Sequence, residues 1–93
     1  MATKILIPTP LRQYTNKADA IQVEGTTVGE LLRNLSEAYS PLKKHLFTED
    51  GRLRSFVNVY LNDEDIRYLQ KEATKVTETD VVSIVPSIAG GLK

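Results

Sequence analysis

Hydrophobic residues recur along the chain in short runs of strand length. Residues 4–7 consist of a lysine and three apolar residues and end at Pro8, which predicts a first strand. Residues 20–24 alternate apolar and polar side chains, so we predict a half-buried strand that forms a hairpin with the first. The apolar run at 81–85 is long enough for a buried strand and too short for a helix. Pro86 ends it by removing a hydrogen-bond donor.

One segment has helical spacing instead. Thr27 and Glu30 fit a capping box, in which each side chain satisfies a free backbone amide at a helix start. The apolar residues that follow recur on one helical face, and they are Val28, Leu31, Leu32, Leu35 and Tyr39. The helix is expected to stop by Ser40, because the residue before a proline is pushed out of helical geometry.

The clearest strand in the middle of the chain is residues 56–61, which are rich in β-branched and aromatic side chains. Alternation places Val57, Val59 and Leu61 on one face. The opposite face receives Phe56, Asn58 and Tyr60, whose two rings are then available to a partner. The alternative for these rings is a small satellite cluster beneath the segment before Phe56.

Turn residues separate the remaining segments. Asn16 suits a left-handed turn position, and residues 48–51 and Asn62-Asp63 are turns by their residue types. Residues 41–47 are expected to add a short turn of helix, and residues 66–69 a short edge strand. The predicted fold is therefore α+β, a mixed sheet of four to five strands with one main helix packed across it.

The C-terminal stretch, residues 87–93, contains the pair Gly90-Gly91. Glycine has no Cβ atom, so its backbone can enter a narrow slot. Fully extended, residues 87–91 would reach roughly 16 Å at about 3.3 Å per residue. We predict a compact domain over residues 1–86 and a flexible tail over residues 87–93 that enters another protein's active site. The alternative is a frayed chain end without chemistry.

Composition narrows the function classes. The 93 residues suit one domain, and 12 basic residues balance 12 acidic ones, which argues against nucleic acid or an anionic membrane as a partner. The absence of cysteine excludes disulfides, thiolate metal sites and a cysteine nucleophile. No apolar run approaches the roughly 20 residues of a membrane span, so we expect a cytoplasmic monomer.

Several polar residues suggest sites but have simpler explanations. The acidic residues 63–65 lack the other ligands of a calcium loop, so we expect a solvated turn and no metal site. His45, beside two lysines, is expected at the surface. Arg12 and Tyr14 are explained equally well as partner contacts or as a turn residue and a core ring.

Three segments together resemble a known family. The helix start at 27–32, the strand and turn at 56–67, and the end at 80–91 are similar to the ubiquitin-like sulfur carrier proteins, which have a β-grasp fold. These include the small subunit of molybdopterin synthase and the thiamine-pathway carrier. Residues 57–67 most resemble the CysO-type branch, which serves cysteine biosynthesis.

The resemblance implies a carrier that is not itself an enzyme and binds no cofactor. An E1-like adenylating enzyme would use ATP to activate the carboxylate of Gly91, and a sulfur donor would convert it to a thiocarboxylate. Ala89 and Gly90 would form the tail that threads into the partner, and Pro86, Ile88, Phe56 and Tyr60 are candidates for a partner interface. In the CysO-type branch, a pyridoxal-phosphate enzyme would receive the sulfur and a metallopeptidase would release the product.

The chain departs from the family pattern in two places. Leu92 and Lys93 follow Gly91, so we expect a peptidase to remove them before activation. Thr79 stands where the family usually has glycine, which questions the turn before the last strand. Two alternatives remain open: the small subunit of a molybdopterin synthase, and a ubiquitin-like modifier that is joined to protein lysines.

Overall fold

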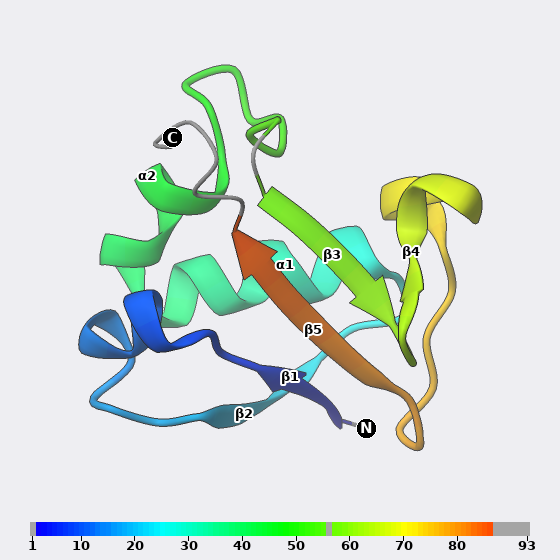
Figure 1. The fold of residues 1–93 in the computed structure, drawn as a ribbon, viewed down its shortest axis with the longest axis horizontal. Helices are drawn as coiled ribbons and strands as arrows, with labels where there is room; N and C mark the ends of the chain where they lie inside the picture. The colour runs from blue at the N-terminus through cyan, green and yellow to red at the C-terminus, as the bar shows by residue number, and fades with distance from the viewer. Residues whose placement is uncertain (1, 56, 87–93) are drawn as a thin grey trace.

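A computed structural model describes residues 2–55 and 57–86 of the chain. Its five-stranded sheet has the order β2-β1-β5-β3-β4. The strands are β1 (Ala2–Leu6), β2 (Ala20–Glu24), β3 (Val57–Leu61), β4 (Glu64–Asp65) and β5 (Val81–Pro86). The central pair β1 and β5 is parallel and the other pairs are antiparallel (Figure 1). The predicted mixed sheet is confirmed.

The single long helix, α1 (Val28–Ala38), crosses one face of this sheet (Figure 1). The hydroxyl of Thr27 accepts a hydrogen bond from the Glu30 N–H at 3.2 Å, as a capping box requires. The Glu30 carboxylate, however, accepts from the N–H of Thr26 at 2.8 Å, one residue earlier than predicted. This backbone hydrogen bond lowers the pKa of Glu30 below its ordinary value.

The core lies between α1 and the sheet. The predicted helical face is confirmed, because its aliphatic side chains Val28, Leu31, Leu32 and Leu35 are completely buried. They pack against inward-facing side chains of the sheet, among them Ile5, Val59 and Val82. As predicted, Val57 and Val59 are buried on one face of β3, and Leu61 packs against the same core.

Short helical segments link the main elements. The helix end near Ser40 and the helical turn after it are confirmed, as η2 (Ser40–Leu42) and α2 (Lys43–Leu46). Asn16 has φ 56°, the left-handed conformation expected of it. The 3₁₀ helix η1 (Thr9–Tyr14), in contrast, was not predicted. Thr79 does not have the positive φ that would demand glycine, so it does not disturb the turn before β5.

The predicted edge strand at 66–69 is wrong. The chain forms only the two residues of β4 and then two 3₁₀ turns, η3 (Ile66–Tyr68) and η4 (Lys71–Ala73). The carboxylate of Asp65 accepts the N–H of Arg67 at 2.9 Å and so caps η3. Ile66 is thereby turned into the core, where only 4% of it is exposed. Burial of Ile66 and the Asp65 cap therefore stabilise the 3₁₀ turn relative to a strand.

A side-chain clamp ties the β3–β4 turn to the start of β5. Asn62 and Asp63 have φ values of 52° and 74°, which confirms the tight turn. The Asn62 side chain donates to the Asp80 carboxylate at 2.9 Å and accepts from the Val81 N–H at 2.9 Å. The hydrogen bond from Asn62, followed by that from the Thr77 backbone, lowers the pKa of Asp80. The clamp fixes where β5 begins.

Replacement of Asn62 by alanine is expected to lower the free energy of unfolding by about 1–3 kcal/mol. Alanine loses both side-chain hydrogen bonds and is strained at a positive φ. Asn62→Gly is the matched control, because glycine loses the same hydrogen bonds without backbone strain. In urea unfolding, the free energy of unfolding of the glycine variant should lie between those of the wild type and the alanine variant. An alanine variant as stable as wild type would show that the clamp does not stabilise the fold.

Candidate functional site

The predicted functional end of the chain begins where β5 stops. Of the predicted site residues, Ile88, Ala89, Gly90 and Gly91 lie outside the described residues, as does Phe56. The division of the chain at residue 86 also stays a prediction. What the structure does describe is the root of the tail, where Pro86 is the last residue of β5 and pairs in register with Val57.

This root is firmly held, because β5 is an inner strand. It pairs in parallel with β1 along three residues and antiparallel with β3 along five. Val82 and Ile84 point into the core, with 0% and 3% of their surface exposed. An inner strand with buried side chains resists fraying more than an edge strand does. The sheet therefore directs whatever follows Pro86 from a fixed point.

The sheet face opposite α1 is open and carries an apolar patch. Leu6 and Val85 are the two strand residues with large exposed apolar side chains, at 39% and 45%. Leu6 pairs in register with Ser83, and Ser83 pairs with Tyr60, so these three residues form a row across β1, β5 and β3. Val85 lies two residues beyond Ser83 on the same face. We call Leu6, Tyr60, Ser83 and Val85 the open-face patch.

Sequence reasoning found only part of this patch. Tyr60 was expected on the exposed face and is half-exposed there, beside Ser83. Val85 was missed because the apolar run at 81–85 was interpreted as a buried strand, and Leu6 was not singled out within the first predicted strand. The available clue was the single helix: one helix covers one face, so every second residue of an apolar strand must remain uncovered. Pro86 is half-exposed at the end of the same strand.

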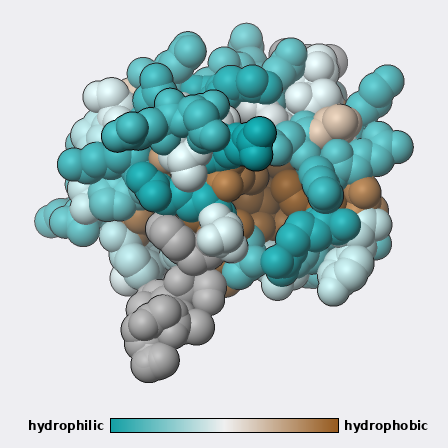
Figure 2. Space-filling view, turned by 90° about the horizontal axis from the view of Figure 1, so that it is seen from above, coloured by the Kyte–Doolittle hydropathy of each residue, from teal (hydrophilic) through white to brown (hydrophobic). Residues whose placement is uncertain are grey.

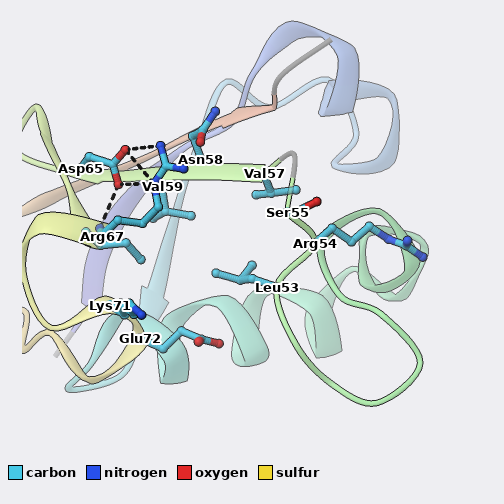
Figure 3. A pocket seen from close by; sticks show the side chains of 11 residues that line it. Leu53, Arg54, Ser55, Val57, Asn58, Val59, Asp65, Arg67, Lys71 and Glu72 are labelled. Atoms are coloured by element: carbon cyan, nitrogen blue, oxygen red, sulfur yellow. Dashed lines mark hydrogen bonds and ion pairs between the residues drawn. The ribbon is translucent and has the colours of Figure 1, made fainter. Parts of the chain in front are cut away.

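A second surface feature is a groove on the other side of β3. Figure 2 shows a hollow with a hydrophobic floor and a hydrophilic rim. The groove holds about 180 Å³, with Leu53, Val57, Val59 and Ile66 among its lining residues. Figure 3 shows Leu53 directed into it from the segment before β3, while Lys71 and Glu72 stand on the side of η4. The groove offers room for an apolar side chain rather than a catalytic centre.

An ion pair closes one end of the groove (Figure 3). The Arg67 guanidinium donates to Asp65 with an Nη2 to Oδ2 distance of 2.7 Å. The hydrogen bond from Arg67 lowers the pKa of Asp65, and the same contact raises that of Arg67. The expectation that Asp65 belongs to a solvated turn is wrong, since only 8% of it is exposed. Its role in the fold is to cap η3.

His45 was expected at the surface and is instead half-buried. Its ring stacks on that of Tyr14 with 4.5 Å between the ring centroids. Its Nε2 atom is buried and has no hydrogen-bond partner among the described residues. Arg12 donates from Nε to the carbonyl of Ile7 at 2.9 Å. These contacts support the structural explanation of Arg12 and Tyr14, as turn residue and core ring.

Within residues 2–55 and 57–86, no three histidine or acidic side chains lie close enough together to bind a metal ion. The three lowered carboxyl pKa values, those of Glu30, Asp65 and Asp80, all have structural hydrogen bonds as their cause. Over the same ranges, none of the helices has the length and apolar character needed to cross a membrane.

Comparison with known proteins identifies close relatives. The model of the ThiS family matches residues 5–91. Sulfur carrier protein CysO of Mycobacterium tuberculosis is 37% identical over an alignment of 93 residues that covers 98% of this chain and 100% of that protein. The BexX/CysO complex of Amycolatopsis orientalis contains a chain that superposes with a TM-score of 0.86 at 34% identity, covering 97% of this chain and 100% of that one. Small archaeal modifier protein 3 of Haloferax volcanii is 38% identical over 68 residues, 73% of each chain.

Proposed function

The chain belongs to the ThiS family, and from that membership we propose that it is a sulfur carrier that holds sulfur as a thiocarboxylate on Gly91. The observation that carries the proposal is full-length similarity to a sulfur carrier that extends to the Gly90-Gly91 pair, because the family match ends at residue 91. The β5 root supports it, because pairing with β1 and β3 holds the end of the strand from which this pair would be delivered.

The chemistry follows from the weak electrophilicity of a free carboxylate. An oxygen of the Gly91 carboxylate attacks the α-phosphorus of ATP in an E1-like enzyme, and pyrophosphate leaves. Hydrosulfide from a sulfur donor then attacks the acyl carbon of the adenylate, AMP leaves, and a proton is released. The product is a thiocarboxylate. All catalytic groups belong to the partner, and this chain supplies the acyl group and its delivery.

Leu92 and Lys93 must be removed for this chemistry to occur at Gly91. Because Leu92 follows Gly91 in the sequence, the Gly91 carbonyl is part of an amide and is not a free carboxylate. A metallopeptidase that cleaves after Gly91 is therefore part of the proposal. A pyridoxal-phosphate enzyme that builds cysteine would be the acceptor of the sulfur, in keeping with the CysO relative.

The open-face patch is the proposed contact with the enzymes that receive the tail. Leu6 and Val85, which are exposed, and the half-exposed Tyr60 form an apolar surface across β1, β5 and β3, and β5 is the strand that leads to the tail. Exposed apolar surface of this kind on a small domain indicates a binding site. Docking on the open-face patch would position Pro86 at the mouth of the partner's slot.

Intact mass spectrometry tests the proposal. The chain ending at Gly91, incubated with ATP, an E1-like enzyme and a sulfide donor, is expected to gain the mass difference between one sulfur and one oxygen. The matched control omits ATP, which blocks formation of the adenylate. A chain that keeps its mass under the complete conditions would contradict the proposal, provided that a CysO-type carrier is loaded in parallel.

A modifier function is a second candidate. It is favoured by the 38% identity to a protein named small archaeal modifier protein 3. Activation would be the same, but a lysine amine of another protein would then attack the acyl carbon and leave an amide. The same mass experiment in a cell extract distinguishes the two, because lysine-linked adducts of higher mass would replace the thiocarboxylate.

A further inference from the structure

The segment that leads from α2 into β3 gathers positive charge. It carries four basic residues against two acidic ones, namely Lys43, Lys44, Arg52 and Arg54 against Glu49 and Asp50. Because the whole chain has a net charge of +0, this excess is local. Asp50 lies 3.7 Å from Arg52 and partly neutralises it. The uncompensated charge is therefore concentrated on Lys43, Lys44 and Arg54.

These three cations line one hollow, which holds about 400 Å³. We call Lys43, Lys44 and Arg54 the basic surface. Arg54 is fixed there, because its Nε donates to the carbonyl of Lys44 at 2.7 Å. Arg54 also lines the groove beside β3, and Figure 3 shows its side chain extended away from that of Leu53. Among the described residues none of the three cations forms an ion pair, and Glu49 is the acidic residue beside them.

The basic surface lies close to the root of the tail. The carbonyl of Arg54 accepts the N–H of Val57 at 3.0 Å, and Val57 pairs in register with Pro86. Figure 1 shows α2 and the start of β3 at the same end of the sheet as the end of β5. Any protein that takes up the tail as far as its root must therefore approach these cations.

We propose that the basic surface docks against an acidic patch beside the tail-binding slot of the activating enzyme, and so orients the domain for threading. The inference rests on the proposed function and adds a partner surface to it. Complementary charge raises association rates by about 10–10³-fold and fixes the orientation of docking. Three cations are too few for nucleic acid, since a protein bound there typically contacts about 6–10 phosphates.

The test is a charge reversal measured with the chain ending at Gly91. The variant Lys43→Glu with Lys44→Glu is expected to lower kcat/KM for loading by about tenfold or more at low salt, through KM rather than kcat. Lys17→Glu with Lys75→Glu is the matched control, because both lysines are exposed and neither lines the hollow that holds the basic surface. The difference should shrink at high salt, where the Debye length falls to about 3 Å.

A change of opposite sign completes the test. Glu49→Gln removes the acidic residue beside the cations and should raise kcat/KM by about twofold, an increase that a loss of folding cannot produce. Equal kcat/KM values for the charge-reversal variant and its control would overturn the inference about the basic surface. Loading of the wild type in the same experiment would still support the proposed function. Tight binding of an RNA oligonucleotide by the wild type, lost on reversal, would also overturn the inference. If the wild-type chain ending at Gly91 were never loaded, both the proposed function and the inference about the basic surface would be refuted.

Discussion

The 93-residue chain is expected to remain unloaded in a reaction of purified components that contains no peptidase, whereas the chain ending at Gly91 is loaded. Two further residues place the terminal carboxylate roughly 7 Å beyond the Gly91 carbonyl, at about 3.3 Å per extended residue. Misplacement of reacting atoms by about 1 Å can already cost 10²-fold in rate. We therefore expect a loss of at least about 10²-fold.

The measurement is the fraction of thiocarboxylate over time by intact mass. Both chains contain β5 and its Pro86 end, so their unfolding midpoints should agree, and a difference in loading then reports on the chain end. Gly91→Ala in the shorter chain is the second control, since a Cβ obstructs the slot without touching the described core. If the 93-residue chain were loaded as fast as the chain ending at Gly91, Lys93 would be the functional terminus and no trimming would be required.

The main elements of the fold were predictable because apolar periodicity reports burial directly. Alternation at 20–24 gave β2 with the bounds that the structure has. The spacing of Leu31, Leu32 and Leu35 identified the face of α1 that is completely buried. In both segments the local sequence pattern and the tertiary packing favour the same structure. Where the two agree, secondary structure can be predicted from the sequence.

Prediction failed where a contact between distant or adjacent side chains overrode local composition. Residues 66–69 have the composition of a strand, yet the Asp65 cap and the burial of Ile66 form a 3₁₀ turn that leaves Tyr68 83% exposed. His45 follows two lysines and so seemed a surface residue. Its ring stacks on Tyr14, a residue from a different segment of the chain, and nothing in the local sequence around His45 indicates that pairing.

The site divides in the same way. Gly90 and Gly91 were predicted from the sequence, because a glycine pair near a chain end is rare and leaves the backbone without Cβ atoms, and as site residues they stay a prediction. The basic surface was not recognised, since Arg54 joins Lys43 and Lys44 only through the hydrogen bond to the Lys44 carbonyl. Charges separated by ten residues form one surface only after folding. The proposed chemistry of the tail therefore depends on its local sequence, whereas the proposed docking that delivers the tail to a partner depends on tertiary structure.

Presentation of the tail to a partner depends on the core that holds β5 in place. A substitution in this core is therefore the second change for which we expect a large effect. Leu32→Ala is expected to lower the free energy of unfolding by about 2–5 kcal/mol, because Leu32 is completely buried between α1 and the sheet. For a domain of this size, whose total stability is about 5–15 kcal/mol, that is a substantial share. The midpoint of thermal unfolding should fall by roughly 10 °C or more.

Leu6→Ala is the control for this variant, because it removes the same atoms from a leucine that is 39% exposed on the open-face patch. Its free energy of unfolding should fall by about 1–2 kcal/mol, less than for Leu32→Ala, because 39% of Leu6 is already exposed and no closed cavity is left. The two variants then separate fold from docking. Leu32→Ala should bind the activating enzyme normally below its unfolding midpoint, whereas Leu6→Ala should remain folded and bind more weakly. Equal losses of stability would show that the open face is as tightly packed as the core, and the open-face patch would not be a docking surface.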